Sequence, residues 1–106
     1  MRFDQELNMA EKARAEGNEG KARVCARRAA GIIVEQYLIR RSTPVTRSNA
    51  YTLLQTLIQI NDLPDVTKEM ARHFLLRITP DHTLPVEADL IAEARWLAYE
   101  LLGNEM

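Results

Sequence analysis

The stretch VCARRAAGIIVEQYLI, residues 24–39, constrains the fold more than any other part of the chain. Its apolar residues recur at helical spacing, and around residues 32–34 they cover most sides of the predicted helix. A helix of this kind is usually central and covered by its neighbours. Gly31 costs a helix about 1 kcal/mol relative to alanine. We therefore expect the small residues 29–31 to allow a close approach by another backbone.

Helical spacing also dominates the rest of the chain, whereas alternating strand patterns and hairpin dipeptides are nearly absent. The sequence predicts one domain, residues 1–106, with an all-α fold: an antiparallel up-and-down four- to five-helix bundle with short connections. Helices are expected over about residues 3–16, 19–41, 48–60, 64–78 and 85–102.

Glycine, asparagine and proline mark the expected helix ends. Gly17 and Gly103 suit left-handed termini, and Asn18 is placed to cap the second helix. Ser48 or Thr46 is expected to cap the third helix, while Pro64 and Pro85 suit the starts of the last two. In the fourth helix the spacing predicts that the following residues are buried: Val66, Met70, Phe74, Leu75 and Ile78.

Composition limits the classes of partner. The 14 basic and 15 acidic residues give a net charge of −1, so there is no overall attraction to nucleic acid or membranes. No apolar run approaches the roughly 20 residues of a membrane span, and the N-terminus lacks a signal-peptide core. We expect a cytoplasmic protein that does not engage membranes. The single cysteine, Cys25, excludes an internal disulfide and is interpreted as a buried apolar residue.

Residues that could bind a metal are sparse. His73 and His82 are the only histidines, and neither HxxxH nor CxxC occurs. Two acid pairs, Glu87 with Asp89 and Asp89 with Glu93, are better explained as acids favoured at a helix start by the helix dipole. We expect no metal and no cofactor.

A basic group in the first half of the central helix consists of Lys21, Arg23, Arg27 and Arg28. Arg23 and Arg27 are one turn apart, and Lys21 and Arg28 are two turns apart, so each pair shares a face. Such residues can contact the phosphates of a nucleotide or nucleic acid. Alternatively, nearby acids neutralise them in a solvated, salt-bridged face.

The segment RITPDHTLP, residues 77–85, contains the candidate catalytic pair, Arg77 and His82. In RNA cleavage a histidine can act as general acid or base, while an arginine stabilises the charge on the phosphate, without a metal. The same letters also suit a connection between helices, because Pro80 interrupts a helix and Pro85 can open the next.

The order of these elements resembles the HEPN family of small helical bundles, over about residues 5–103. AEKARAEGNEGKARVCARRAAGIIVEQYLIRRS is similar to the opening helices of the family, and SNAYTLLQTLIQINDLPDVTKEMARHFLLRI to its middle. RITPD followed by VEADLIAEARWLAYELL resembles its Arg-Tyr-Pro-Asp loop and closing helix, with the motif falling on Arg77, Pro80 and Asp81. The usual Glu and Lys of the second helix fall on Gly31 and Ile32.

The resemblance implies a HEPN-like bundle that forms a homodimer. Many such proteins bind nucleotides or partner a minimal nucleotidyltransferase, often in toxin–antitoxin pairs. Another branch uses an Arg-x4-6-His motif as a metal-free endoribonuclease, and Arg77 and His82 satisfy that spacing. Three hypotheses follow: a non-catalytic accessory or nucleotide-binding module, an endoribonuclease acting on RNA, and a purely structural interaction bundle.

Overall fold

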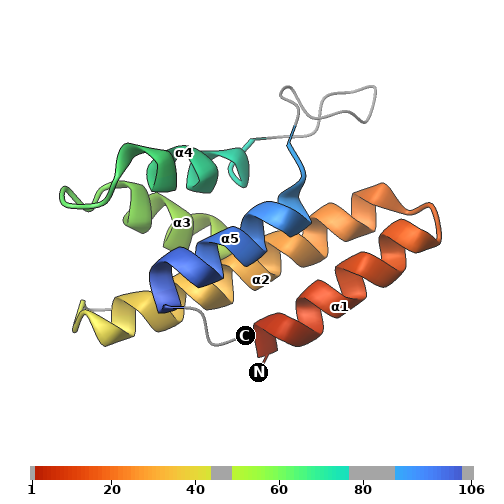
Figure 1. Ribbon diagram of the computed structural model, residues 1–106, viewed down its shortest axis with the longest axis horizontal. Helices are drawn as coiled ribbons and strands as arrows, with labels where there is room; N and C mark the ends of the chain where they lie inside the picture. The colour runs from red at the N-terminus through yellow and green to blue at the C-terminus, as the bar shows by residue number, and fades with distance from the viewer. Residues whose placement is uncertain (1, 44–48, 77–87, 104–106) are drawn as a thin grey trace.

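The computed structural model describes residues 2–43, 49–76 and 88–103. These residues form five α-helices and no strand (Figure 1), which confirms the predicted all-α bundle. The helices are α1 (Arg2–Ala15), α2 (Glu19–Arg40), α3 (Ala50–Ile58), α4 (Asp65–His73) and α5 (Leu90–Leu102).

Helices α1 and α2 form an antiparallel hairpin (Figure 1), whose short turn has the predicted residues. Gly17 adopts a left-handed conformation with φ of 82°, which ends α1 without the steric cost that a side chain would bring. The Asn18 side chain then accepts a hydrogen bond of 3.0 Å from the backbone N–H of Lys21, which caps α2. Both predictions for this turn are confirmed.

Helix α2 is the centre of the bundle and packs against α1, α3 and α5. Gly31 explains how α3 comes so close: a Cβ added at this glycine would lie 2.7 Å from the Cβ and 3.0 Å from the Cα of Ala50. The expected close approach is therefore made by the first turn of α3. Cys25 is fully buried in the same helix, as predicted.

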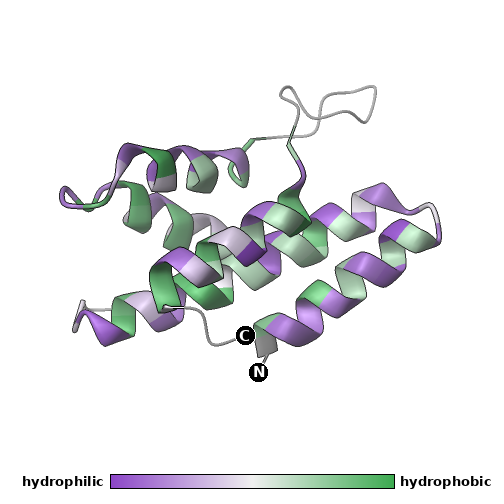
Figure 2. Cartoon of the chain, in the orientation of Figure 1, coloured by the Kyte–Doolittle hydropathy of each residue, from purple (hydrophilic) through white to green (hydrophobic). Residues whose placement is uncertain are grey.

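The two short helices α3 and α4 form a second hairpin, and α5 lies along α2 (Figure 1). Apolar side chains from all five helices form one core. In Figure 2 the turns of α1 are mixed purple and green, as expected for a helix that packs one face on the core. Within the described residues, no helix combines the length and the apolar character needed to cross a bilayer.

The ends of α3, α4 and α5 differ from the predictions. Asn49 caps α3 by accepting a hydrogen bond from Thr52 N–H, so the proposed caps at Ser48 or Thr46, which lie outside the described residues, are not needed. Helix α4 stops at His73, because the backbone N–H groups of the next two residues form tighter i,i−3 bonds. Helix α5 begins at Leu90, not Pro85, because Asp89 caps it.

One burial prediction in α4 is wrong. Val66 is 52% exposed, because α4 is a short helix that lies on the edge of the bundle and turns its polar side and this valine outward. Phe74 is fully buried as predicted, while Met70 and Leu75 are partly buried against the core. Ile78 lies outside the described residues.

Candidate functional site

The four basic residues in the first half of α2 do not form one patch. Arg23 and Arg27 lie on the side of α2 that faces the ends of α4 and α5, whereas Lys21 and Arg28 lie beside α1. A helix places residues two positions apart on nearly opposite sides, which explains the separation of Lys21 from Arg23. The predicted contact residues therefore divide into two pairs with different neighbours.

Arg27 is bound to the chain that leaves α4. Its Nε donates a hydrogen bond of 2.8 Å to the carbonyl oxygen of Phe74, and its Nη2 donates one of 3.2 Å to the carbonyl oxygen of Leu76. Carbonyl groups at a helix end lack helical donors, and a guanidinium can satisfy two of them at once. Arg27 therefore fixes the backbone up to the residue that directly precedes Arg77.

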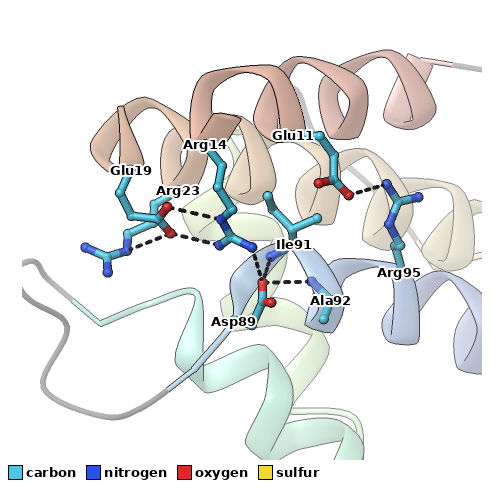
Figure 3. Close-up of polar contacts among 8 residues, drawn as sticks. All are labelled: Glu11, Arg14, Glu19, Arg23, Asp89, Ile91, Ala92 and Arg95. Atoms are coloured by element: carbon cyan, nitrogen blue, oxygen red, sulfur yellow. Dashed lines mark hydrogen bonds and ion pairs between the residues drawn. The ribbon is translucent and has the colours of Figure 1, made fainter. Parts of the chain in front are cut away.

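A second arginine, Arg14 of α1, performs the same kind of role at the start of α5 (Figure 3). Its guanidinium donates to both carboxylate oxygens of Glu19, at 3.1 and 2.8 Å, and to Asp89 Oδ1 at 3.0 Å. Asp89 also accepts the backbone N–H bonds of Ile91 and Ala92 that begin α5. One network thus joins α1, the first turn of α2 and the first turn of α5.

The pKa values of this network follow from its hydrogen bonds. The hydrogen bond from Arg14 lowers the pKa of Glu19 below its usual value, against an opposing effect of burial. Burial alone would raise the pKa of Asp89, but the backbone N–H of Ala92 and the Arg14 guanidinium outweigh it and lower the pKa. The bond to Glu19 raises the pKa of Arg14 further above its already high value. All three groups are charged at neutral pH.

Arg23 joins the edge of the same network. Its Nε lies 3.9 Å from Glu19 Oε2, and its side chain is 21% exposed (Figure 3). Glu19 is therefore shared between Arg14 and Arg23. The alternative interpretation of a salt-bridged face describes this side of α2 well, because its arginines already have acidic or carbonyl partners.

A histidine that sequence patterns did not single out as a site residue, His73, lies between α4 and α5. Its Nδ1 is 2.7 Å from Glu93 Oε1, and the two side chains are only 17% and 14% exposed. Its Nε2 lies 3.5 Å from Glu69 Oε2 on the outer side of α4. A carboxylate on one imidazole nitrogen is the arrangement that orients a general base. Here the other nitrogen also faces an acid, so the histidine mainly ties α4 to α5.

Sequence spacing could not find this pair, because His73 and Glu93 are twenty residues apart on different helices. Glu93 was interpreted only as part of an acid pair at a helix start. That interpretation is correct for Asp89, which caps α5, whereas Glu93 binds the histidine.

The predicted catalytic pair, Arg77 and His82, lies outside the described residues. The described residues nearest in sequence, Leu76 and Asp89 with its neighbour Ala88, lie at the end of the bundle occupied by Arg14, Arg23 and Arg27. The structure therefore assembles a polar cluster beside the residues that flank 77–87. We call it the arginine end, defined by Arg14, Glu19, Arg23, Arg27 and Asp89.

The other two basic residues have weaker partners. Arg28 is 57% exposed and lies 3.7 Å from Glu6 Oε1 of α1, a distance for an ion pair and not a hydrogen bond. Lys21 is exposed beside α1, next to Lys12 and Glu16. Neither residue lies at the arginine end.

In the part of the chain that the structure describes, no three His, Cys, Asp or Glu side chains come together as a metal-binding group. Comparison with protein-family models found no match to this chain. No curated protein and no solved structure matched it either. The fold and the site thus define a five-helix bundle, counted over the described residues, with a polar cluster at one end.

Proposed function

We propose that this chain is a HEPN-like, non-catalytic accessory module that binds the phosphates of a nucleotide at the arginine end and partners a minimal nucleotidyltransferase. One observation carries the proposal. Arg27 holds the carbonyl oxygen of Leu76, so the backbone is fixed up to the residue before Arg77, on which the family's motif falls. Fixed backbone next to a binding residue reduces the entropy lost when a ligand is bound.

The roles of the arginines differ in this proposal. Arg77 contacts phosphate, because guanidinium groups pair with phosphate oxygens in a bidentate manner. Arg27 is a positioning residue, since both of its observed bonds go to backbone carbonyl oxygens. Arg23 adds positive charge nearby, while Lys21 and Arg28 are excluded from the site by their location beside α1.

Calorimetric titration of the purified chain with ATP tests this arrangement. We expect Arg77→Gln to weaken binding by about tenfold or more, because a charge-assisted pair is lost. Arg27→Gln should weaken it less, through a looser site. Lys21→Gln is the matched control and should leave binding unchanged. Absence of nucleotide binding, or equal losses in the Arg77 and Lys21 variants, would contradict the proposed site.

The solution mass and the effect of expression test the remaining parts. A homodimer, or a stable complex with a nucleotidyltransferase, is expected for an accessory module. A strict monomer that binds neither a nucleotide nor such a partner would exclude it. Toxic expression that His82→Ala relieves, together with RNA cleavage by the pure protein, would instead establish the endoribonuclease.

A further inference from the structure

A groove runs along α2 between α1 and α3, away from the arginine end. Helices α1 and α3 each pack on α2 but, over their described residues, not on each other. Gly31 of α2 and Ala50 of α3, which approach each other closely, both line this groove. Its hollow has a volume of about 250 Å³. The hollow is therefore larger than the space of a single water molecule and has room for a small ligand.

The lining of the groove combines apolar and charged side chains. Ile32 and Leu53 supply the apolar surface, and Leu53 is buried. Glu6 of α1, together with Arg28 and Glu35 of α2, supplies the charged groups. Two carboxylates against one guanidinium leave the groove with a net negative charge.

The Glu6 carboxylate is the unusual group in this lining. The Glu6 side chain is 23% exposed, but its Oε1 atom is buried and accepts no hydrogen bond from the described residues; Arg28 Nη1, its ion-pair partner, is 3.7 Å away. A buried carboxylate oxygen without a donor is costly, so it favours a ligand that brings an N–H group. Glu35 adds a second negative charge and has no ion pair with the described residues of the chain.

We propose that this groove binds a small primary alkylamine as its ammonium ion. The ammonium donates to the buried Glu6 oxygen and is attracted by Glu35, while the short alkyl chain lies on Ile32 and Leu53. An ammonium provides three N–H donors and no acceptor, which matches a site where the buried Glu6 oxygen has no donor among the described residues. The site is separate from the arginine end and does not depend on the nucleotide proposal.

The charges of the groove favour this ligand over a phosphate. A phosphate near Arg28 would meet the carboxylates of Glu6 and Glu35, whereas an ammonium meets them favourably. The opposing effect of Arg28 provides the sharpest test. Neutralising Arg28 should tighten the binding of a cation, whereas it should weaken the binding of an anion.

The full chain should be titrated with butylamine, with butan-1-ol as the uncharged control of similar size, and followed by backbone amide NMR. Saturable shifts at Gly31 and Ala50, with butylamine only, are expected. Glu6→Gln should weaken binding by about tenfold, since a charged hydrogen bond is lost. Arg28→Gln should tighten it by about threefold, since a like charge is removed.

Two further variants complete the test. Glu35→Gln should weaken butylamine binding by about threefold and keeps the test valid should Glu6→Gln fail to fold. Glu16→Gln changes an exposed acid outside the groove and should have no effect. The proposal is overturned by three outcomes: no saturable shift, an equal response to butan-1-ol, or weaker binding in Arg28→Gln.

Discussion

The two sides of α2 use adjacent arginines in opposite ways. On one side, Arg27 donates two hydrogen bonds to backbone carbonyl oxygens and anchors the end of α4. On the other side, its neighbour Arg28 is exposed and reaches only a 3.7 Å ion pair with Glu6. Arg27 therefore holds two parts of the fold together, while Arg28 lines the groove between α1 and α3. Adjacent arginines therefore contribute differently to stability, because the neighbouring helices offer them different hydrogen-bond acceptors.

The acids of the two sides differ in the same manner. Glu93 and Glu19 each accept a short bond from a side-chain donor, His73 and Arg14 respectively. Glu6 has a buried oxygen that no described residue donates to. Among the described residues, the acids of the arginine end, Glu19 and Asp89, accept hydrogen bonds from Arg14, whereas the buried oxygen of Glu6 in the groove accepts none. Four experiments test this contrast.

The largest loss of stability is expected from a substitution at Gly31, where α2 contacts the first turn of α3. Gly31→Val would force its side chain into the Cβ and Cα of Ala50, because even a lone Cβ would lie 2.7 Å from the former. We expect a loss of about 3 kcal/mol in the free energy of unfolding. Urea denaturation measures it. Gly20→Val is the matched control in the same helix, since its Cβ would have no neighbour closer than 3.9 Å. Equal losses in the two variants would show that helix propensity, and not packing, is responsible.

The next effect compares the adjacent arginines directly. Arg27→Gln removes two bonds to carbonyl oxygens at the end of α4 and should cost about 2 kcal/mol of unfolding free energy. Arg28→Gln should cost less than about 0.5 kcal/mol, because exposed ion pairs contribute little. Hydrogen exchange should also show faster opening near Phe74 only in the Arg27 variant. Similar unfolding free energies for the two variants would show that Arg27 and Arg28 contribute equally to stability, contrary to this expectation.

These expectations show what sequence patterns can and cannot provide. The helical spacing and the glycine–asparagine turn predicted α1 and α2 closely, because the signals are local. The close approach at Gly31 was also predicted, though not that Ala50 would be its partner. The separation of Arg27 from Arg28 depends on which helix covers each side, and no local pattern contains that information. The start of α5 was misplaced because Pro85 and Asp89 are both suitable helix starts.

A smaller effect concerns acid stability at the arginine end. The pKa values of Glu19 and Asp89 are lowered in the folded chain, so both carboxylates stabilise it above their unfolded pKa values. This contribution is lost as the pH falls below the ordinary carboxyl pKa values and through the lower folded ones. Arg14→Gln should therefore reduce stability at pH 7 and flatten this dependence. Because the side chains are partly exposed, we expect at most about 1 kcal/mol at low salt.

Thermal unfolding of the unsubstituted chain and of Arg14→Gln, followed by circular dichroism at about pH 7 and about pH 3.5, measures this difference in stability. Lys12→Gln, another cation of α1 without an ion pair to described residues, serves as the charge-matched control. A parallel loss of stability in all three proteins on acidification would assign the pH dependence to other groups.

The smallest effect is expected from a comparison of two glutamates, Glu93 of α5 and Glu6 of α1, that differ in their partners. Glu93→Gln weakens a charged bond to His73 in a mostly buried position and should cost about 1 kcal/mol of unfolding free energy. Glu6→Gln removes a charge whose buried oxygen has no donor, so the change should stay within about 0.5 kcal/mol and can be stabilising. Urea denaturation of the two variants compares them. A larger loss at Glu6 than at Glu93 would mean that the groove carboxylate already has a partner in the folded chain, and that the groove is not open to an ammonium ligand.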